Sequence, residues 1–112
     1  MTDEPLILRR WSAHIRTADE AEYVTYIRAT GGDDYQATPG NRGWQMLMRA
    51  LGDGRSQVTT LSWWDSMESI RAFAGEQVER ARYYPEDDRY LLDRPETVEH
   101  HRVPAGSPVK TS

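Results

Sequence analysis

Hydrophobic and polar residues alternate with a period of two in several segments of the chain, which is the pattern of β-strands. Residues 6–15 form the first such segment, and residues 43–51 and 56–64 form the next two. The turn sequence GDGR separates these two segments, so they are predicted to form an antiparallel hairpin. Residues 97–103 alternate again and predict a last strand.

Between the first strand and the hairpin, apolar residues recur at helical spacing. This helix is predicted to begin after Thr17 and to end at the glycine pair Gly31 and Gly32, because glycine commonly terminates helices. The sequence DDYQATPGNRG that follows indicates a loop with room for one helical turn.

A second helical pattern follows the hairpin. Asp65 and Glu68 stand three residues apart, the spacing of a capping box, and the apolar face that follows ends at Gly75. Residues 76–84 are also predicted to be helical. Pro85 is then expected to begin a further helical turn. Three acidic residues follow it at the N-terminus of this turn, where the helix dipole is positive.

The predicted order is strand, helix, strand, strand, helix, strand. This order favours a ferredoxin-like α+β fold, in which both helices cover one face of a four-stranded antiparallel sheet. Large apolar residues occur on both faces of the strands. We therefore expect the face away from the helices to be buried against a second copy of the chain, in a homodimer.

Composition narrows the functional classes. The 112 residues suit one domain, packed over about residues 6–103 with a tail over 104–112, and four Trp and six Tyr supply much of its core volume. The net charge of −4, with no basic stripe, argues against a nucleic-acid partner. Without cysteine and without a membrane-spanning or signal-like apolar run, a cytoplasmic protein is the default expectation.

The segments TTLSWWDSMESIRAFAG, ERARYYPEDDRYLL and TVEHHRV resemble the antibiotic biosynthesis monooxygenase superfamily of dimeric α+β barrels. The resemblance covers about residues 8–103 and implies a pocket between sheet and helices. It also implies cofactor-independent oxidation of a small aromatic or polyketide-type molecule by molecular oxygen. Thr60 stands where the anthrone-oxidising members have asparagine. Residues 76–84 contain no histidine of the kind that binds iron in the haem-degrading members, so haem is not implied.

On this resemblance, the candidate catalytic residues are Trp64, Tyr84 and His100. The candidate substrate-binding residues are Thr60, Phe73, Arg80 and Tyr83. A phenol exchanges hydrogen bonds with an aromatic substrate, histidine titrates near neutral pH, and arginine pairs with a developing oxyanion. No metal site is predicted, since His100 and His101 point to opposite faces of a strand. His14, on a neighbouring strand, could approach one of them.

Other interpretations remain open for these residues. Trp63 and Trp64 face opposite sides of a strand, and either could be packing in the core or at the dimer interface. In the tyrosine pair, we expect Tyr83 to pack beside Val78 and Leu92, and Tyr84, next to Pro85, to offer its hydroxyl to the pocket. A non-catalytic small-molecule-binding dimer is the alternative function, and a packed dimer without a ligand is a third.

Overall fold

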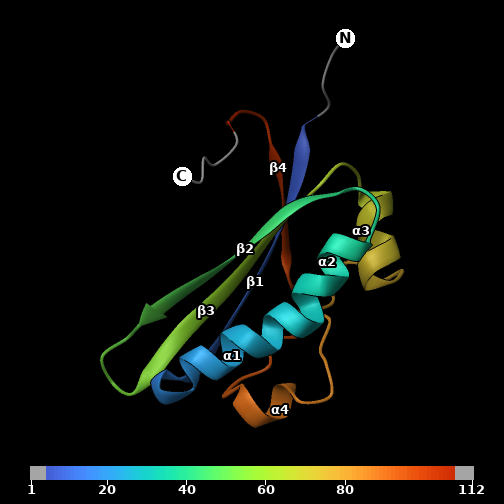
Figure 1. Ribbon diagram of the computed structural model, residues 1–112. Helices are drawn as coiled ribbons and strands as arrows, with labels where there is room; N and C mark the ends of the chain where they lie inside the picture. The colour runs from blue at the N-terminus through green and yellow to red at the C-terminus, as the bar shows by residue number, and fades with distance from the viewer. Residues whose placement is uncertain (1–4, 108–112) are drawn as a thin grey trace.

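The computed structural model describes residues 5–107 and contains one antiparallel sheet of four strands (Figure 1). The strands are β1 (Leu6–Arg16), β2 (Asn41–Ala50), β3 (Arg55–Trp64) and β4 (Glu99–Val103), in the spatial order β2-β3-β1-β4. This is the order of the predicted ferredoxin-like α+β fold, which is confirmed. The last five residues of the expected tail lie outside the described residues.

Helices cover one face of the sheet (Figure 1). A 3₁₀ turn (Thr17–Asp19) leads into α1 (Glu20–Ile27), a π-helical turn (Arg28–Gly32) and α2 (Asp33–Ala37), which together run as one rod across the sheet. After the hairpin come α3 (Met67–Ala74) and the single turn α4 (Asp87–Tyr90). No helix among residues 5–107 is long and apolar enough to cross a membrane.

The prediction that the first helix ends at Gly31 and Gly32 is wrong. Gly32 has a helical φ of −59°, and the helical path continues through it into α2. Both glycines are buried, and a Cβ on Gly32 would lie 2.5 Å from Cζ2 of Trp44. Here the missing side chain serves close packing of the rod on β2, and not helix termination.

Alternation along the central strands builds the core, as predicted. Ala13, Ile15, Val58 and Trp64 point toward the helices and are buried against side chains of α1 and α3. Trp64 is fully buried, whereas Trp63 lies half-buried on the opposite face. The hairpin and its antiparallel pairing are confirmed, with Met46 opposite Thr60 and Met48 opposite Val58.

The cap of α3 lies one residue later than predicted. Ser66 is the N-cap, and its hydroxyl accepts a hydrogen bond of 3.1 Å from the backbone N–H of Ser69. Asp65 precedes the cap, and its Oδ1 accepts a 2.6 Å bond from the Ser69 hydroxyl. The end of the helix at Gly75, with φ of +94°, agrees with the prediction.

Residues 76–84 were predicted to be helical, and this is wrong. They form, with residues 85–92, a segment of turns and irregular stretches that includes α4 and crosses the helix-covered side of the molecule; we call residues 76–92 the crossing segment. Arg80 forms an isolated bridge with Thr97, and backbone bonds join Ala81 to Glu96 and Val98 to Glu79. Pairing with the chain just before β4 outweighs helical propensity here. The predicted turn after Pro85 is present as α4.

The face of the sheet away from the helices has no covering element among residues 5–107. The register places the apolar side chains of Leu8 and Trp63 opposite each other on this face, with Leu61 and Leu47 nearby on β3 and β2. Leu47 is 46% exposed. We call these four residues the open-face cluster.

Candidate functional site

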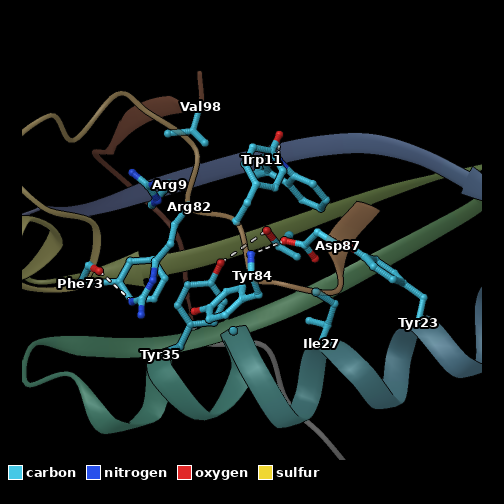
Figure 2. Close-up of a pocket in the computed structure, with 13 residues that line it drawn as sticks. Arg9, Trp11, Tyr23, Ile27, Tyr35, Phe73, Arg82, Tyr84, Asp87 and Val98 are labelled. Carbon is cyan, nitrogen blue, oxygen red and sulfur yellow. Dashed lines mark hydrogen bonds between the residues drawn. The ribbon is translucent and has the colours of Figure 1, made fainter. Parts of the chain in front are cut away.

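A small cavity lies between the sheet, the α1–α2 rod and the crossing segment (Figure 2). Its volume is about 40 Å³, enough for about three water molecules. Six aromatic rings contribute to its wall, together with four charged or hydroxyl side chains that are not aromatic. The lining residues are Arg9, Trp11, Tyr23, Ile27, Gly31, Tyr35, Thr60, Phe73, Arg82, Tyr83, Tyr84, Asp87 and Val98.

Arg9 lies on the helix-facing side of β1 and is 4% exposed. Its Nη1 donates to the carbonyl of Val78 at 2.5 Å, and its Nη2 donates to the carbonyl of Arg80 at 3.0 Å. The same Nη1 lies 3.0 Å from Nε2 of His100. Burial, and then the charge of Arg9, lower the pKa of His100, so its neutral ring serves as an acceptor for the guanidinium.

Asp34 on α2 holds the crossing segment against the rod. Its Oδ2 accepts a 2.6 Å hydrogen bond from the hydroxyl of Tyr84 and lies 3.0 Å from Nη2 of Arg82. Arg82 also donates to the carbonyl of Phe73 at 2.8 Å. Burial, followed by the bond to Asp34, raises the pKa of Tyr84. We call the contacts of Asp34 with Tyr84 and Arg82 the Asp34 latch.

Asp87 supplies a buried carboxylate on the other side of Tyr84 from Arg9 and Arg82 (Figure 2). It is 3% exposed. Its Oδ2 accepts a 2.5 Å bond from the backbone N–H of Tyr84, but its Oδ1 has no hydrogen-bond partner among residues 5–107. The hydroxyls of Tyr23 and Tyr26 are also unpartnered within that range. Burial raises the pKa of Asp87, against the opposing effects of the Tyr84 N–H and the nearby Tyr26 hydroxyl.

Both tyrosines of the pair line the cavity, whereas the sequence predicted only one. Because the segment is not helical, the expected divergence of the two rings does not apply. Tyr83 donates its hydroxyl to the carbonyl of Pro95 and accepts a 3.3 Å bond from Nε1 of Trp11. The hydroxyl of Tyr84 is held by Asp34, and so both hydroxyls have partners within the protein.

The predicted site residues fall into two groups. Thr60, Phe73, Tyr83 and Tyr84 line the cavity. The other three, Trp64, Arg80 and His100, are not among the lining residues. Trp64 donates from Nε1 to the Ser62 hydroxyl at 2.8 Å within the core.

Arg80 and His100 reach the site through Arg9. The side chain of Arg80 is exposed and only its carbonyl contacts the guanidinium. His14 does not approach either β4 histidine, because the register pairs Arg9 with His100 and Leu8 with His101. His14 instead lies 3.1 Å from Asp93.

Across residues 5–107, no three His, Cys, Asp or Glu side chains are grouped so as to hold a metal ion. A second hollow, of about 1390 Å³, opens to solvent beside the start of α3, Trp63 and the end of β4. This hollow is broad, and polar, charged and apolar residues line it. The small cavity at Arg9 and Asp87, with its aromatic wall and buried charged groups, is therefore the candidate site.

The lining residues that the sequence did not predict include Arg9, Arg82 and Asp87. Arg9 had a visible signal, since it occupies the same face as Ile7 and Trp11 in an alternating strand. A charged residue at a core position of a strand is uncommon unless it has a role. Asp87 had none, because it stands within a run of acidic residues that is typical of a solvated helix start.

Solved structures with this architecture were found at low sequence identity. A candidate antibiotic biosynthesis monooxygenase from Bacillus cereus is 14% identical with a TM-score of 0.61, over 94% of this chain and 99% of the other. A protein of unknown function from Nitrosomonas europaea is 16% identical with a TM-score of 0.64, over 97% and 98%. The chain has the antibiotic biosynthesis monooxygenase fold. The resemblance seen in the sequence is thus confirmed at the level of the fold.

The same fold occurs in a haem-degrading protein from Mycobacterium tuberculosis, which is 16% identical with a TM-score of 0.59 over 92% of this chain and 99% of that one. Neither the models of known protein families nor the curated proteins contain a match to the sequence. The likeness therefore establishes how the chain is folded, and the chemistry has to be argued from the cavity.

Proposed function

We propose that the protein binds a small aromatic or polyketide-type molecule in this cavity and oxidises it with molecular oxygen, without a metal or organic cofactor. One observation carries the proposal: the unpartnered Oδ1 of buried Asp87 belongs to a wall that is otherwise largely aromatic. A desolvated carboxylate with a free oxygen is suited to accept a proton from a bound molecule.

The proposed reaction begins when Asp87 removes a proton from an activated CH₂ group that is conjugated with a carbonyl through the adjoining aromatic rings. The pKa of Asp87 is raised toward neutral pH, so its carboxylate is a stronger base than that of an exposed aspartate. The resulting enolate reacts with oxygen. One oxygen atom stays on the substrate and the other leaves as water, so CH₂ and O₂ become C=O and H₂O.

A ring-sized ligand needs more room than about 40 Å³, so the crossing segment has to move outward when the ligand enters. Isolated bridges and side-chain contacts hold this segment, not a continuous strand ladder, and such segments open more readily than core strands. Opening the Asp34 latch frees the donors of Tyr84 and Arg82. Both then become available to the developing enolate oxygen.

The other predicted residues act in this proposal by shaping the site. Phe73, Thr60 and Tyr83 form walls for the ring. Trp64 supports Phe73, with ring centroids 5.4 Å apart. His100 and the Arg80 carbonyl orient Arg9.

A second copy of the chain is proposed to cover the open-face cluster. Leu8, Leu47, Leu61 and Trp63 share that face, and an apolar patch of this kind is uncommon on a monomer. A two-fold contact would bring the same four residues from both copies together.

Anthrone is a suitable probe, since its activated CH₂ flanked by two rings has the required chemistry. Oxygen uptake and anthraquinone formation would be followed for wild type, Asp87→Asn and the neighbouring control Asp88→Asn, whose side chain is exposed. We expect Asp87→Asn to lower the rate at least about 100-fold and Asp88→Asn to keep it. Equal rates for all three proteins and for buffer would refute the oxygenase proposal.

A non-catalytic binding protein is the second candidate. The observation that favours it is that both hydroxyls of Tyr83 and Tyr84 are already engaged within the protein. In that case anthrone would bind and change the tryptophan fluorescence of Trp11, while oxygen uptake would stay at the buffer rate.

A further inference from the structure

Arg9 is a buried cation without an acidic partner. Across residues 5–107, no carboxylate oxygen lies within 4.0 Å of its guanidinium nitrogens. Its neighbours at hydrogen-bond distance are two main-chain carbonyls and the His100 ring. These groups accept hydrogen bonds from the guanidinium, but none of them carries a negative charge that would neutralise it.

An uncompensated charge is costly in a protein interior, so buried charges are normally paired. Burial lowers the pKa of Arg9, Tyr35 opposes this effect, and the nearby Arg82 adds to it. A hydrophobic side chain at this position would pack between Ile7 and Trp11 without that cost. The retained guanidinium therefore points to a negative partner that is not part of the described chain.

Arg82 places a second cation at the same end of the cavity (Figure 2). The guanidinium carbons of Arg9 and Arg82 lie 5.8 Å and 4.9 Å from the centre of the Phe73 ring. The acid that pairs with Arg82 is Asp34, which also accepts from Tyr84. Arg82 thus has one carboxylate partner and Arg9 has none, so this end of the cavity carries a net positive charge.

We infer that the ligand of this cavity is an aromatic carboxylic acid, whose carboxylate lies between Arg9 and Arg82 while its ring contacts the aromatic wall. Guanidinium groups match the planar geometry of a carboxylate. The other end of the cavity holds Asp87, which favours a ligand whose charge is confined to one end. This inference rests on the proposed binding site and is independent of the proposed reaction with oxygen.

Benzoate and the neutral benzamide are matched probes, which differ in charge at nearly equal size. Binding would be titrated by calorimetry and by tryptophan fluorescence for wild type, Arg9→Gln and Arg10→Gln. Arg10 is the control, because it is the adjacent residue on β1, points to the open face and lies 3.9 Å from Glu99. Arg82→Gln adds a variant at a partly exposed side chain, so the test does not depend on the folding of Arg9→Gln alone.

We expect wild type and Arg10→Gln to bind benzoate at least about tenfold more tightly than benzamide, and Arg9→Gln and Arg82→Gln to lose this preference. Equal binding of both probes by wild type would overturn the inference and leave the proposed binding site intact. Equal weakening by Arg9→Gln and Arg10→Gln would assign the effect to surface charge and also overturn it. Binding of neither probe would overturn the inference together with the proposed site.

Discussion

Tyr84 and Asp34, 50 positions apart in the sequence, are joined by a hydrogen bond of 2.6 Å between the tyrosine hydroxyl and the carboxylate. This bond and the ion pair of Asp34 with Arg82 connect the crossing segment to α2. The boundary of the cavity on that side therefore depends on one acidic residue.

Replacing Asp34 should loosen the crossing segment. We expect Asp34→Ala to raise amide hydrogen exchange about tenfold or more in residues 80–90, because both latch contacts are lost, while exchange in β1 and β3 stays unchanged. Asp33→Ala, at the exposed neighbouring position, serves as the control. Unchanged exchange in Asp34→Ala would show that the latch does not hold the segment.

Gly32→Ala should destabilise the fold by about 1–3 kcal/mol, because the new methyl group would overlap the Trp44 ring. Gly31→Ala is the matched control. Its Cβ would meet Tyr84 at an ordinary 3.9 Å, so we expect no loss of stability beyond about 0.5 kcal/mol. Urea denaturation measures both, and equal stabilities of the two variants would contradict the close approach of the rod to β2.

Ser66→Ala should cost about 0.5–2 kcal/mol, since the backbone N–H of Ser69 loses its acceptor at the start of α3. Glu68→Ala, at an exposed position of the first turn, should change stability by less than about 0.5 kcal/mol. Thermal unfolding would measure the difference. A larger loss in Asp65→Ala than in Ser66→Ala would restore the cap predicted from sequence.

His100 should make the fold less stable in mild acid. Burial, then Arg9, and to a lesser extent His101 lower its pKa, while Glu79 opposes them. Below about pH 6.5 the unfolded chain therefore binds a proton that the folded chain does not. Stability falls as pH drops through this window, by up to about 1.4 kcal/mol per pH unit.

His100→Gln keeps an acceptor for Arg9 but cannot titrate. We expect urea denaturation between pH 7.5 and 5.5 to give a shallower loss of stability for this variant than for wild type. His101→Gln, at an exposed position, is the control and should follow wild type. An identical pH dependence in all three proteins would contradict the burial of a neutral His100.

The protein should sediment as a dimer at micromolar concentration. Leu8→Asp places a charge within the open-face cluster and should give a monomer, whereas Ala21→Glu, at an exposed position on α1, should not. A stable wild-type monomer at this concentration would refute sheet-to-sheet assembly.

The sequence predicted the strands well. In β1 and β3 the alternation extends over ten residues, and only one register places the buried apolar side chains on the helix-covered face. It failed at Gly31 and Gly32, since a glycine that ends a helix and one that admits a neighbouring ring look the same in a single sequence. It also failed at residues 76–84, whose helical composition is overridden by pairing with residues 96–98.

The candidate site was predicted in part for a similar reason. Aromatic residues such as Phe73 and Tyr84 stood out by type, and the fold brought them together. Arg9 and Asp87 are distinctive because they are buried charges. Their burial results from contacts between segments that are distant in the sequence, so it cannot be predicted from either segment alone. Trp64 was prominent in the sequence, but its position directly under α3 makes it a core residue.

The contacts of Arg9 have a consequence for the order of folding. They join a residue of the first strand to Val78, Arg80 and His100, at separations of 69, 71 and 91 positions. Contacts this distant in sequence form late, after the hairpin and the rod have local partners. During synthesis, the cavity is therefore completed only after the crossing segment has left the ribosome, and a nascent chain that ends before residue 76 contains β1, the rod and the hairpin but lacks several residues of the cavity wall.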